Sequence, residues 1–110
     1  MTHEFAKSLT IPVWPYYSKD FPEERTIIIS DDFVLNNIEV FQKPIVYSYL
    51  FDRPAPGINY HGISIFDVSS CESFILNLSQ DCEASEERDL LIRFLEEAVK
   101  ENMYVIHFGI

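Results

Sequence analysis

Glycine is scarce in this sequence, and the few glycines are scattered. Gly57, Gly62 and Gly109 are the only three in 110 residues. Loops that cradle nucleotide phosphates need closely spaced glycines, because the backbone must approach the phosphate oxygens without a side chain in the way. The sequence therefore excludes nucleotide chemistry of the familiar glycine-loop types, and we expect no cofactor.

Residues that commonly bind metals are also few and far apart. Cys71 and Cys82 are the only cysteines, and they do not form a Cys-x-x-Cys motif. His3, His61 and His107 are widely separated, so no two of them have the ligand spacing found on a helix. A metal site would have to be assembled by the fold alone, and we predict none.

No long apolar run is present. The N-terminus reads Met-Thr-His-Glu-Phe-Ala-Lys, which lacks the basic start and continuous apolar stretch of a signal peptide. No segment approaches the roughly 20 apolar residues that a transmembrane helix needs. Two cysteines without a secretion signal are expected to be reduced, so the expected compartment is the cytoplasm.

Positive charge is in short supply. Eight Lys and Arg stand against 18 Asp and Glu, which gives a formal net charge of −10. This excess argues against binding to nucleic acid, whose phosphates need cations, and against binding to anionic membranes. It favours fast association with a basic protein, because long-range attraction raises the encounter rate. The alternative is an acidic surface that serves only solubility.

Apolar residues, in contrast, are plentiful enough for a folded core. Hydrophobic residues make up 47% of the chain and aromatic residues 15%, which predicts one folded domain over 1–110. Pro12, Pro15 and Pro22 interrupt the first 25 residues. Proline removes a backbone donor and disfavours helix before it. We therefore expect 1–25 to be an irregular, aromatic-rich arm that packs on the domain.

Short β-branched and aromatic runs separated by turn residues dominate the middle of the chain. The predicted strands are 27–29, 38–41, 45–51, 60–68 and 73–79, with a terminal strand over 104–108 and a loop over 52–57. In 73–79, Phe74, Leu76 and Leu78 are expected on the core side. This spacing is typical of an antiparallel meander. It predicts an α+β fold with a twisted, mostly antiparallel sheet of five to seven strands.

One long amphipathic helix is predicted over about 85–101, packed on a face of the sheet. Ser85 can accept a capping hydrogen bond, and acidic residues follow it in the first turn. The apolar residues that recur with the spacing of one helical face are Leu90, Leu91, Phe94, Leu95, Ala98 and Val99. We expect Leu91, Phe94 and Leu95 to face the core.

No residue pattern predicts catalysis. Cys71 would need a base, and His61 could supply one across a hairpin, but a small buried cysteine is the better interpretation. Asp31 and Asp32 are adjacent, and adjacent residues of a strand point to opposite faces. We expect them to cap turns and hydrate the surface. A small unrecognised enzyme around His61, Cys71 or His107 stays the third hypothesis.

Two features favour protein binding instead. Carboxylates crowd the approach to the predicted helix, and tyrosines recur at period two in the 45–51 strand. The residues predicted to bind a partner are Asp81, Glu83, Glu86, Glu87, Asp89, Tyr47 and Tyr49. Carboxylates would steer a basic partner, and tyrosine offers a large contact area with a polar tip. A solvated face and ordinary core packing are the respective alternatives.

In size, acidity, α+β make-up, aromatic content and lack of a catalytic motif, the chain resembles the small acidic immunity proteins of bacterial toxin–immunity systems. These include the systems of contact-dependent growth inhibition. Immunity proteins share no diagnostic motif, so no residue role carries over. The resemblance implies tight binding to a basic toxin domain, often a nuclease, whose active site is blocked. The main alternative is a non-catalytic structural or regulatory subunit with an acidic surface.

Overall fold

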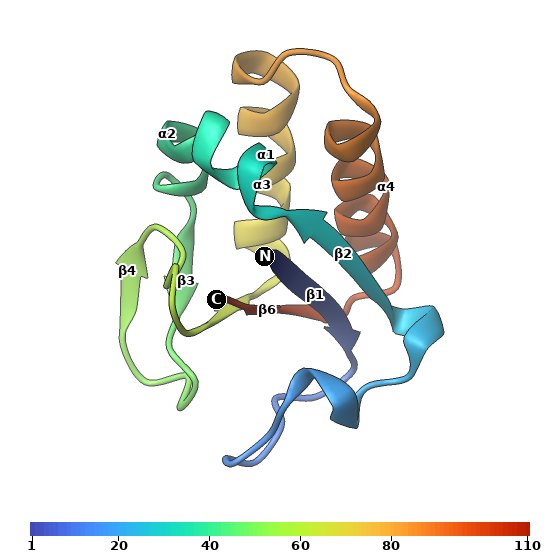
Figure 1. The fold of residues 1–110 in the computed structure, drawn as a ribbon. Helices are drawn as coiled ribbons and strands as arrows, with labels where there is room; N and C mark the ends of the chain where they lie inside the picture. The colour runs from blue at the N-terminus through green and yellow to red at the C-terminus, as the bar shows by residue number, and fades with distance from the viewer.

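Six strands form one antiparallel sheet in the computed structural model, which covers residues 1–110. They are β1 (Thr2–Ser8), β2 (Thr26–Ser30), β3 (Ile45–Tyr47), β4 (Pro54–Pro56), β5 (Ile63–Phe66) and β6 (Tyr104–Phe108), in the spatial order β2-β1-β6-β5-β3-β4. The first and last strands are neighbours, so the two chain ends lie close together (Figure 1). The predicted α+β class and strand number are confirmed. The predicted meander is wrong, because β6 lies between β1 and β5.

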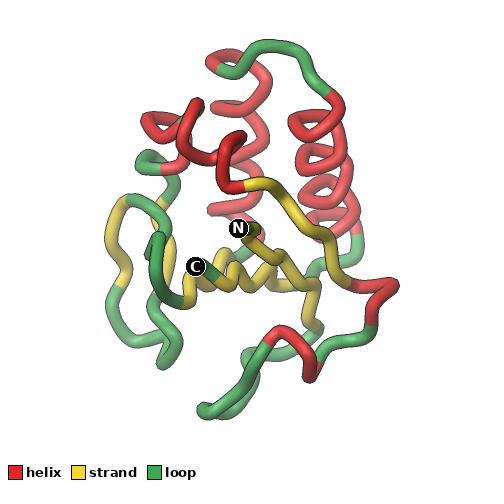
Figure 2. Tube along the Cα trace, in the orientation of Figure 1, coloured by secondary structure: helices red, strands yellow, loops and turns green.

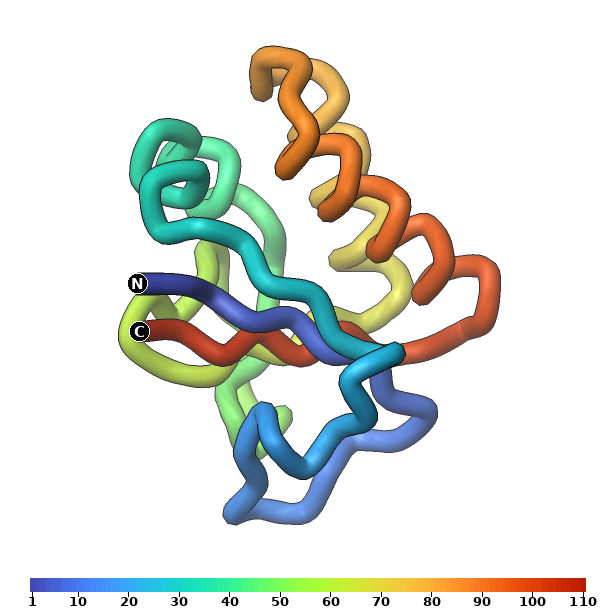
Figure 3. The backbone as a smooth tube through the Cα atoms, turned by 45° about the vertical axis from the view of Figure 1, so that its right-hand side comes forward, coloured from blue at the N-terminus to red at the C-terminus, as the bar shows by residue number.

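Four helices cover one face of this sheet. They are α1 (Asp31–Asn36), α2 (Ile38–Phe41), α3 (Val68–Asp81) and α4 (Glu86–Lys100). The segment 9–25, which contains two short 3-10 turns, crosses the opposite face (Figures 2 and 3). None of the helices is long and apolar enough to cross a membrane. The helices and segment 9–25 therefore form the outer layers, with the sheet between them.

Each face of the sheet has its own apolar cluster, because successive strand residues point to opposite faces. Phe5 and Val105 belong to the large cluster under the helices. Ile65 and Ile106 belong to a smaller cluster on the other face, where Tyr16 packs on them. Tyr16 anchors segment 9–25 to the sheet, as expected for a covering loop.

The long helix predicted near the C-terminus is confirmed as α4. The Arg88 backbone N–H donates to Ser85 Oγ over 3.1 Å, which caps the first turn. Leu91 and Leu95 are fully buried, and Phe94 is 4% exposed. The apolar face of α4 therefore packs into the core as its spacing predicted.

The strand predicted over 73–79 is wrong, because these residues lie inside α3. Asp67 caps that helix by accepting from the Ser70 backbone N–H over 2.8 Å. Phe74 and Leu78 are fully buried and four residues apart, as one helical face requires. Leu76 is 55% exposed. Because Leu76 lies midway between Phe74 and Leu78, apolar residues recur here at every second position, as they would in a strand.

Several other predicted boundaries need correction. Residues 38–41 form α2 rather than a strand, and β5 takes only Ile63–Phe66 of the predicted 60–68. The 45–51 strand ends at Tyr47, because the chain turns there: the Phe51 N–H donates to the Ser48 carbonyl over 2.8 Å, and Phe51 has a φ of 56°. The predicted loop 52–57 contains the short edge strand β4.

The N-terminal arm predicted to be irregular over 1–25 instead begins with β1, a central strand. Its partners are β2 on one side and β6 on the other. His3, Phe5 and Lys7 are all buried. Two of these three side chains are polar. The sequence of β1 therefore does not show the alternating apolar residues that are typical of a strand with one buried face.

Candidate functional site

The predicted acidic cluster gathers at one end of the helical layer. The chain leaves α3 at Asp81 and enters α4 at Glu86, and the turn between them lies at the top of Figure 1. Asp81, Glu83, Glu86 and Asp89 are exposed. Four of the five predicted carboxylates therefore share one solvent-facing end of the molecule.

A groove runs between this turn and helices α1 and α2. It consists of two adjoining hollows of about 540 and 440 Å³, which share Asn36, Asn37 and Asp81. Glu83 lines the first hollow and Glu39 lines the second. We call this surface the acidic groove and define it by these five residues.

The acidic groove presents mainly oxygen acceptors. The Asn37 amide nitrogen donates to the Phe33 carbonyl over 2.9 Å, which leaves the amide oxygen free to accept. Lys43 is the one cation in the lining, and its Nζ lies 3.0 Å from Asp81 Oδ2. Lysine and arginine side chains offer several charge-assisted donors to such oxygens. A cationic side chain is therefore the chemical group that fits this groove.

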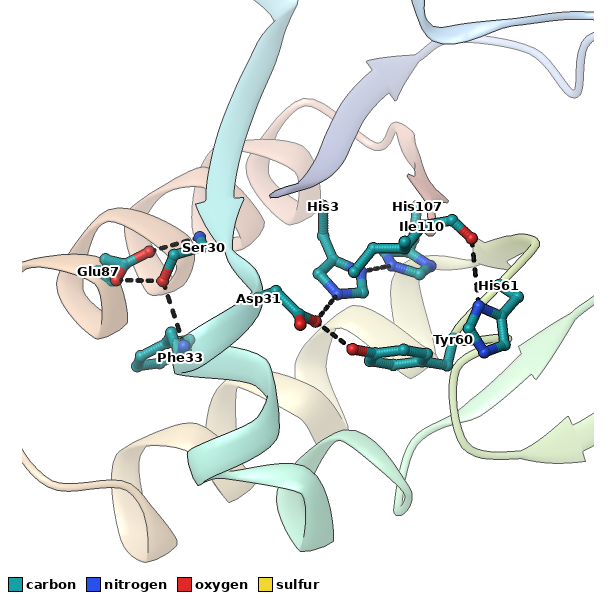
Figure 4. A network of polar contacts seen from close by, with 9 residues as sticks. All are labelled: His3, Ser30, Asp31, Phe33, Tyr60, His61, Glu87, His107 and Ile110. Carbon is teal, nitrogen blue, oxygen red and sulfur yellow. Dashed lines mark hydrogen bonds and ion pairs between the residues drawn. The ribbon is translucent and has the colours of Figure 1, made fainter. Parts of the chain in front are cut away.

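Glu87 is engaged inside the fold rather than free to bind. Its two carboxylate oxygens accept from the Ser30 backbone N–H at 2.7 Å and from Ser30 Oγ at 2.8 Å (Figure 4). Ser30 Oγ in turn accepts from the Phe33 N–H over 3.1 Å, which caps α1. Glu87 thus links α4 to β2 and α1, and we remove it from the partner-binding residues.

At each edge of the sheet, at least one backbone N–H that could pair with another strand is occupied or missing. The Asp31 N–H donates to the Met1 carbonyl, so the Ser30 N–H points away from β1, toward the edge where Glu87 accepts it. At the opposite edge, Pro54 and Pro56 have no N–H to donate. Strand addition is therefore disfavoured at the β4 edge.

The predicted tyrosines lie on the other face of the sheet. Tyr47 stacks on Phe51, with ring centroids 4.0 Å apart, and is half-buried. Tyr49 is 39% exposed, and its ring packs on Trp14 with centroids 4.4 Å apart. In Figure 1 the loop after β3 lies at the bottom, away from the acidic turn. The structure therefore does not bring the tyrosines and the carboxylates into one site.

The fold does bring together residues that sequence reasoning kept apart. His3 Nδ1 lies 2.9 Å from His107 Nε2, although the residues are 104 positions apart. His3 Nε2 lies 2.9 Å from Asp31 Oδ1, which also accepts from the Tyr60 hydroxyl (Figure 4). His107 Nδ1 lies 3.3 Å from Ser64 Oγ. No motif or residue spacing in the sequence predicts this set, because the pairing of β1 with β6 brings the residues together.

This buried set is a polar part of the core rather than an exposed reaction centre. Both imidazoles and Ser64 are fully buried, and Asp31 is 8% exposed. Asp31 is thus not the surface turn residue that was predicted, whereas Asp32 is exposed. A substrate could reach Ser64 only if the fold opened.

The surroundings shift the pKa values of three of these groups. Burial, and then the neighbouring His3, lower the pKa of His107 to about 3. Hydrogen bonds from Tyr60 and His3 hold the pKa of Asp31 below its ordinary value. The hydrogen bond to Asp31, together with burial, raises the pKa of Tyr60 to about 12. The environment therefore favours a neutral His107 beside an ionised Asp31.

Cys71 has neither the base nor the acidity of a nucleophile. Because 73–79 is helical, no hairpin places His61 across from it as had been considered. Burial, reinforced by Asp67 and Glu72, raises the pKa of Cys71 to about 12. Cys71 and Cys82 are both buried and free. No group of three or more His, Cys, Asp or Glu side chains is arranged to hold a metal ion.

The sequence matches no family model, no curated protein and no solved structure at a significant level. The function must therefore be inferred from the geometry and charge of the acidic groove.

Proposed function

We propose that this protein binds a basic protein and inhibits it, with the acidic groove as the contact surface. The observation that carries the proposal is the continuous groove of side-chain oxygens in a chain of net charge −10. The resemblance to immunity proteins suggests the partner: a bacterial toxin domain such as a nuclease.

The groove would recognise a lysine or arginine that projects from the partner. Its side-chain oxygens accept from such a cation, and the cation competes with Lys43 for Asp81. Lys43 is half exposed, so moving it aside costs little. Leu35, on α1 next to Asn36, is 50% exposed and offers apolar contact beside the groove. An interface here would combine a charged pocket with an apolar rim.

Inhibition follows from the chemistry of a basic target. Enzymes that act on nucleic acids bind phosphates with lysine and arginine. A protein that offers carboxylate and amide oxygens to the same side chains competes with the substrate for them. The surrounding negative charge speeds the encounter, because opposite charges attract over about 10 Å at moderate salt.

The proposal includes a reducing, cytoplasmic location and a non-catalytic role. Two free, buried cysteines support the first. The complete burial of Ser64 and His107, together with the raised pKa of Cys71, supports the second.

A second candidate is a structural or regulatory subunit that docks through its aromatic face. Trp14 and Tyr49 border a shallow hollow of about 310 Å³, and Val13 beside them is 88% exposed. Exposed apolar side chains grouped in this way favour a contact between proteins. In that case the acidic groove would serve only solubility.

The experiment that separates the two candidates first captures a basic partner from native cell extract and then compares the binding of charge-reversed variants to it. Glu39→Lys with Glu83→Lys changes the groove. Glu23→Lys with Glu24→Lys makes the same charge change at an exposed site on another part of the surface. We expect the groove variant to bind at least about tenfold more weakly than the control, since each lost charge contact contributes roughly 1 kcal/mol. Equal affinities would contradict the groove and favour the aromatic face.

A further inference from the structure

One continuous hydrogen-bonded chain joins both ends of the protein to α1. Its members come from five different segments, in the order Tyr60, Asp31, His3, His107 and Ser64. Figure 4 shows the first four joined by dashed lines. Asp31 is the first residue of α1, so this chain fixes the start of that helix to the sheet.

Ser64 and Asp31, near the two ends of the chain, each accept a hydrogen bond from a group outside the histidine pair. At one end the Asn59 backbone N–H donates to Ser64 Oγ over 2.7 Å. At the other end the Tyr60 hydroxyl donates to Asp31. The lowered pKa of Asp31 keeps its carboxylate ionised at neutral pH, so it only accepts.

The ionised Asp31 alone determines the direction of every bond in the chain when both imidazoles are neutral. His3 Nε2 must carry the proton that it donates to Asp31, so His3 Nδ1 accepts from the Nε2–H of His107. His107 Nδ1 then accepts from the Ser64 hydroxyl. Every hydrogen bond points toward Asp31, and each donor has one acceptor.

One added proton breaks this arrangement wherever it binds. On His107 Nδ1, it places an N–H against the Ser64 hydroxyl, which loses its acceptor. On His3 Nδ1, the added proton faces the Nε2–H of His107. His107 must then carry its own proton on Nδ1 instead, where it again faces the Ser64 hydroxyl. Both routes leave a buried hydroxyl unpaired, and a buried unpaired polar group is costly.

Three other titratable groups surround the chain. Asp31 of α1 feels the N-terminal ammonium of Met1. The ring of His61 packs edge-on against Tyr60, with centroids 4.8 Å apart. From α4, Glu87 binds Ser30, the residue before Asp31. Asp31 titrates below its ordinary range and Tyr60 near 12, so neither changes charge between about pH 7.5 and 5.5.

We propose that this chain is an acid-sensitive latch that holds α1, and with it one wall of the acidic groove, against the sheet. Phe33, Asn36 and Asn37 of this region line the groove, so release of α1 would dismantle it. The link to binding rests on the proposed function, whereas the latch itself does not.

The size of the effect follows from His107. Its pKa is lowered from 6.5 to about 3 in the closed state, and opening to water restores the ordinary value. For an opening that exposes the His107 ring to water, linkage raises the equilibrium constant by up to about tenfold between about pH 7.5 and 5.5. The opening is local, so α1 should respond while α4 keeps its protection.

Amide hydrogen exchange on the free protein tests the latch without a partner. Protection factors, corrected for intrinsic exchange, should fall by up to about tenfold for α1 as the pH drops from about 7.5 to 5.5, with little change in α4. His61→Gln, outside the chain, should behave as wild type. No change in α1, or an equal fall in α1 and α4, would overturn the latch. Neither result would affect the binding proposal, which is tested with the partner.

Substitution of His107 tests the mechanism. His107→Gln keeps a donor and an acceptor but cannot titrate, so the pH dependence of α1 protection in this range should be clearly weaker than in wild type, and an unchanged dependence would overturn the role of His107. If that variant does not fold, nitrogen NMR of the wild-type imidazoles decides. We expect the Nε2–H tautomer for both His3 and His107 near neutral pH. An Nδ1–H tautomer for His107 at that pH would overturn the chain direction from which the latch follows.

Discussion

Phe94→Ala removes an aromatic ring that is only 4% exposed and packs in the large apolar cluster. The lost ring leaves a cavity, and such truncations cost about 3–5 kcal/mol. Lys7 adds to the loss, because its Nζ lies 5.5 Å from the ring centroid and is itself nearly buried. This cation–π contact is worth roughly 0.5–1 kcal/mol. We therefore expect the free energy of unfolding to fall by about 4 kcal/mol.

Urea denaturation measures this loss, and Phe94→Leu is the matched control. Leucine refills most of the cavity but removes the ring under Lys7, so it should cost about 1–2 kcal/mol. Lys7 would retain its carboxylate partners Glu97 and Glu101, each 3.5 Å away. A loss below about 1 kcal/mol for Phe94→Ala would contradict the packing of α4 described above.

Three further predictions concern single groups. Glu87→Ala should lower the free energy of unfolding by about 1–3 kcal/mol, because the β2 amide and hydroxyl lose their acceptor, whereas exposed Glu86→Ala should cost under about 0.5. A thiol reagent should find Cys71 and Cys82 unreactive in the native protein and both reactive after unfolding. Because the pKa of His107 is lower in the folded protein than in the unfolded chain, its neutral form contributes its full share to the free energy of unfolding above pH 6.5. This stability, on the order of 4 kcal/mol, should be lost as pH falls toward 3 in acid titrations of unfolding.

Local sequence signals predicted α4 well, but they led to a strand being predicted within α3. In α4 the cap at Ser85 and the apolar spacing agree, so one interpretation fits both. In α3 the exposed Leu76 inserts an apolar residue between Phe74 and Leu78, which makes a helical face look like a strand. The cap at Asp67 was the signal that could have decided between them.

Long-range pairing explains what the sequence could not reveal in β1. His3 and Lys7 are buried although they are polar, and this is affordable only because distant residues satisfy them. His107 and Glu97, which supply two of these contacts, lie about a hundred residues away in the chain. No window along the sequence contains both partners, so the strand and the buried chain of hydrogen bonds were missed.

The candidate site was predictable in charge but not in shape. Exposed carboxylates at Asp81, Glu83, Glu86 and Asp89 were predicted from the acidic run that leads into the helix after Ser85. Their combination with Asn36 and Asn37 into a groove depends on how α1 packs against that turn, and this lies beyond local patterns.

The salt dependence of the association rate is the sharpest test of whether the acidic groove steers a basic partner. Wild type, the Glu39→Lys/Glu83→Lys variant and the Glu23→Lys/Glu24→Lys control would be compared in binding to the captured basic partner. The salt range would take the Debye length from about 10 Å to about 3 Å. We expect the association rate of wild type to fall steeply as salt rises. At low salt, the groove variant should associate more slowly than the control. Equal rates for the two variants, with no effect of salt on wild type, would contradict it.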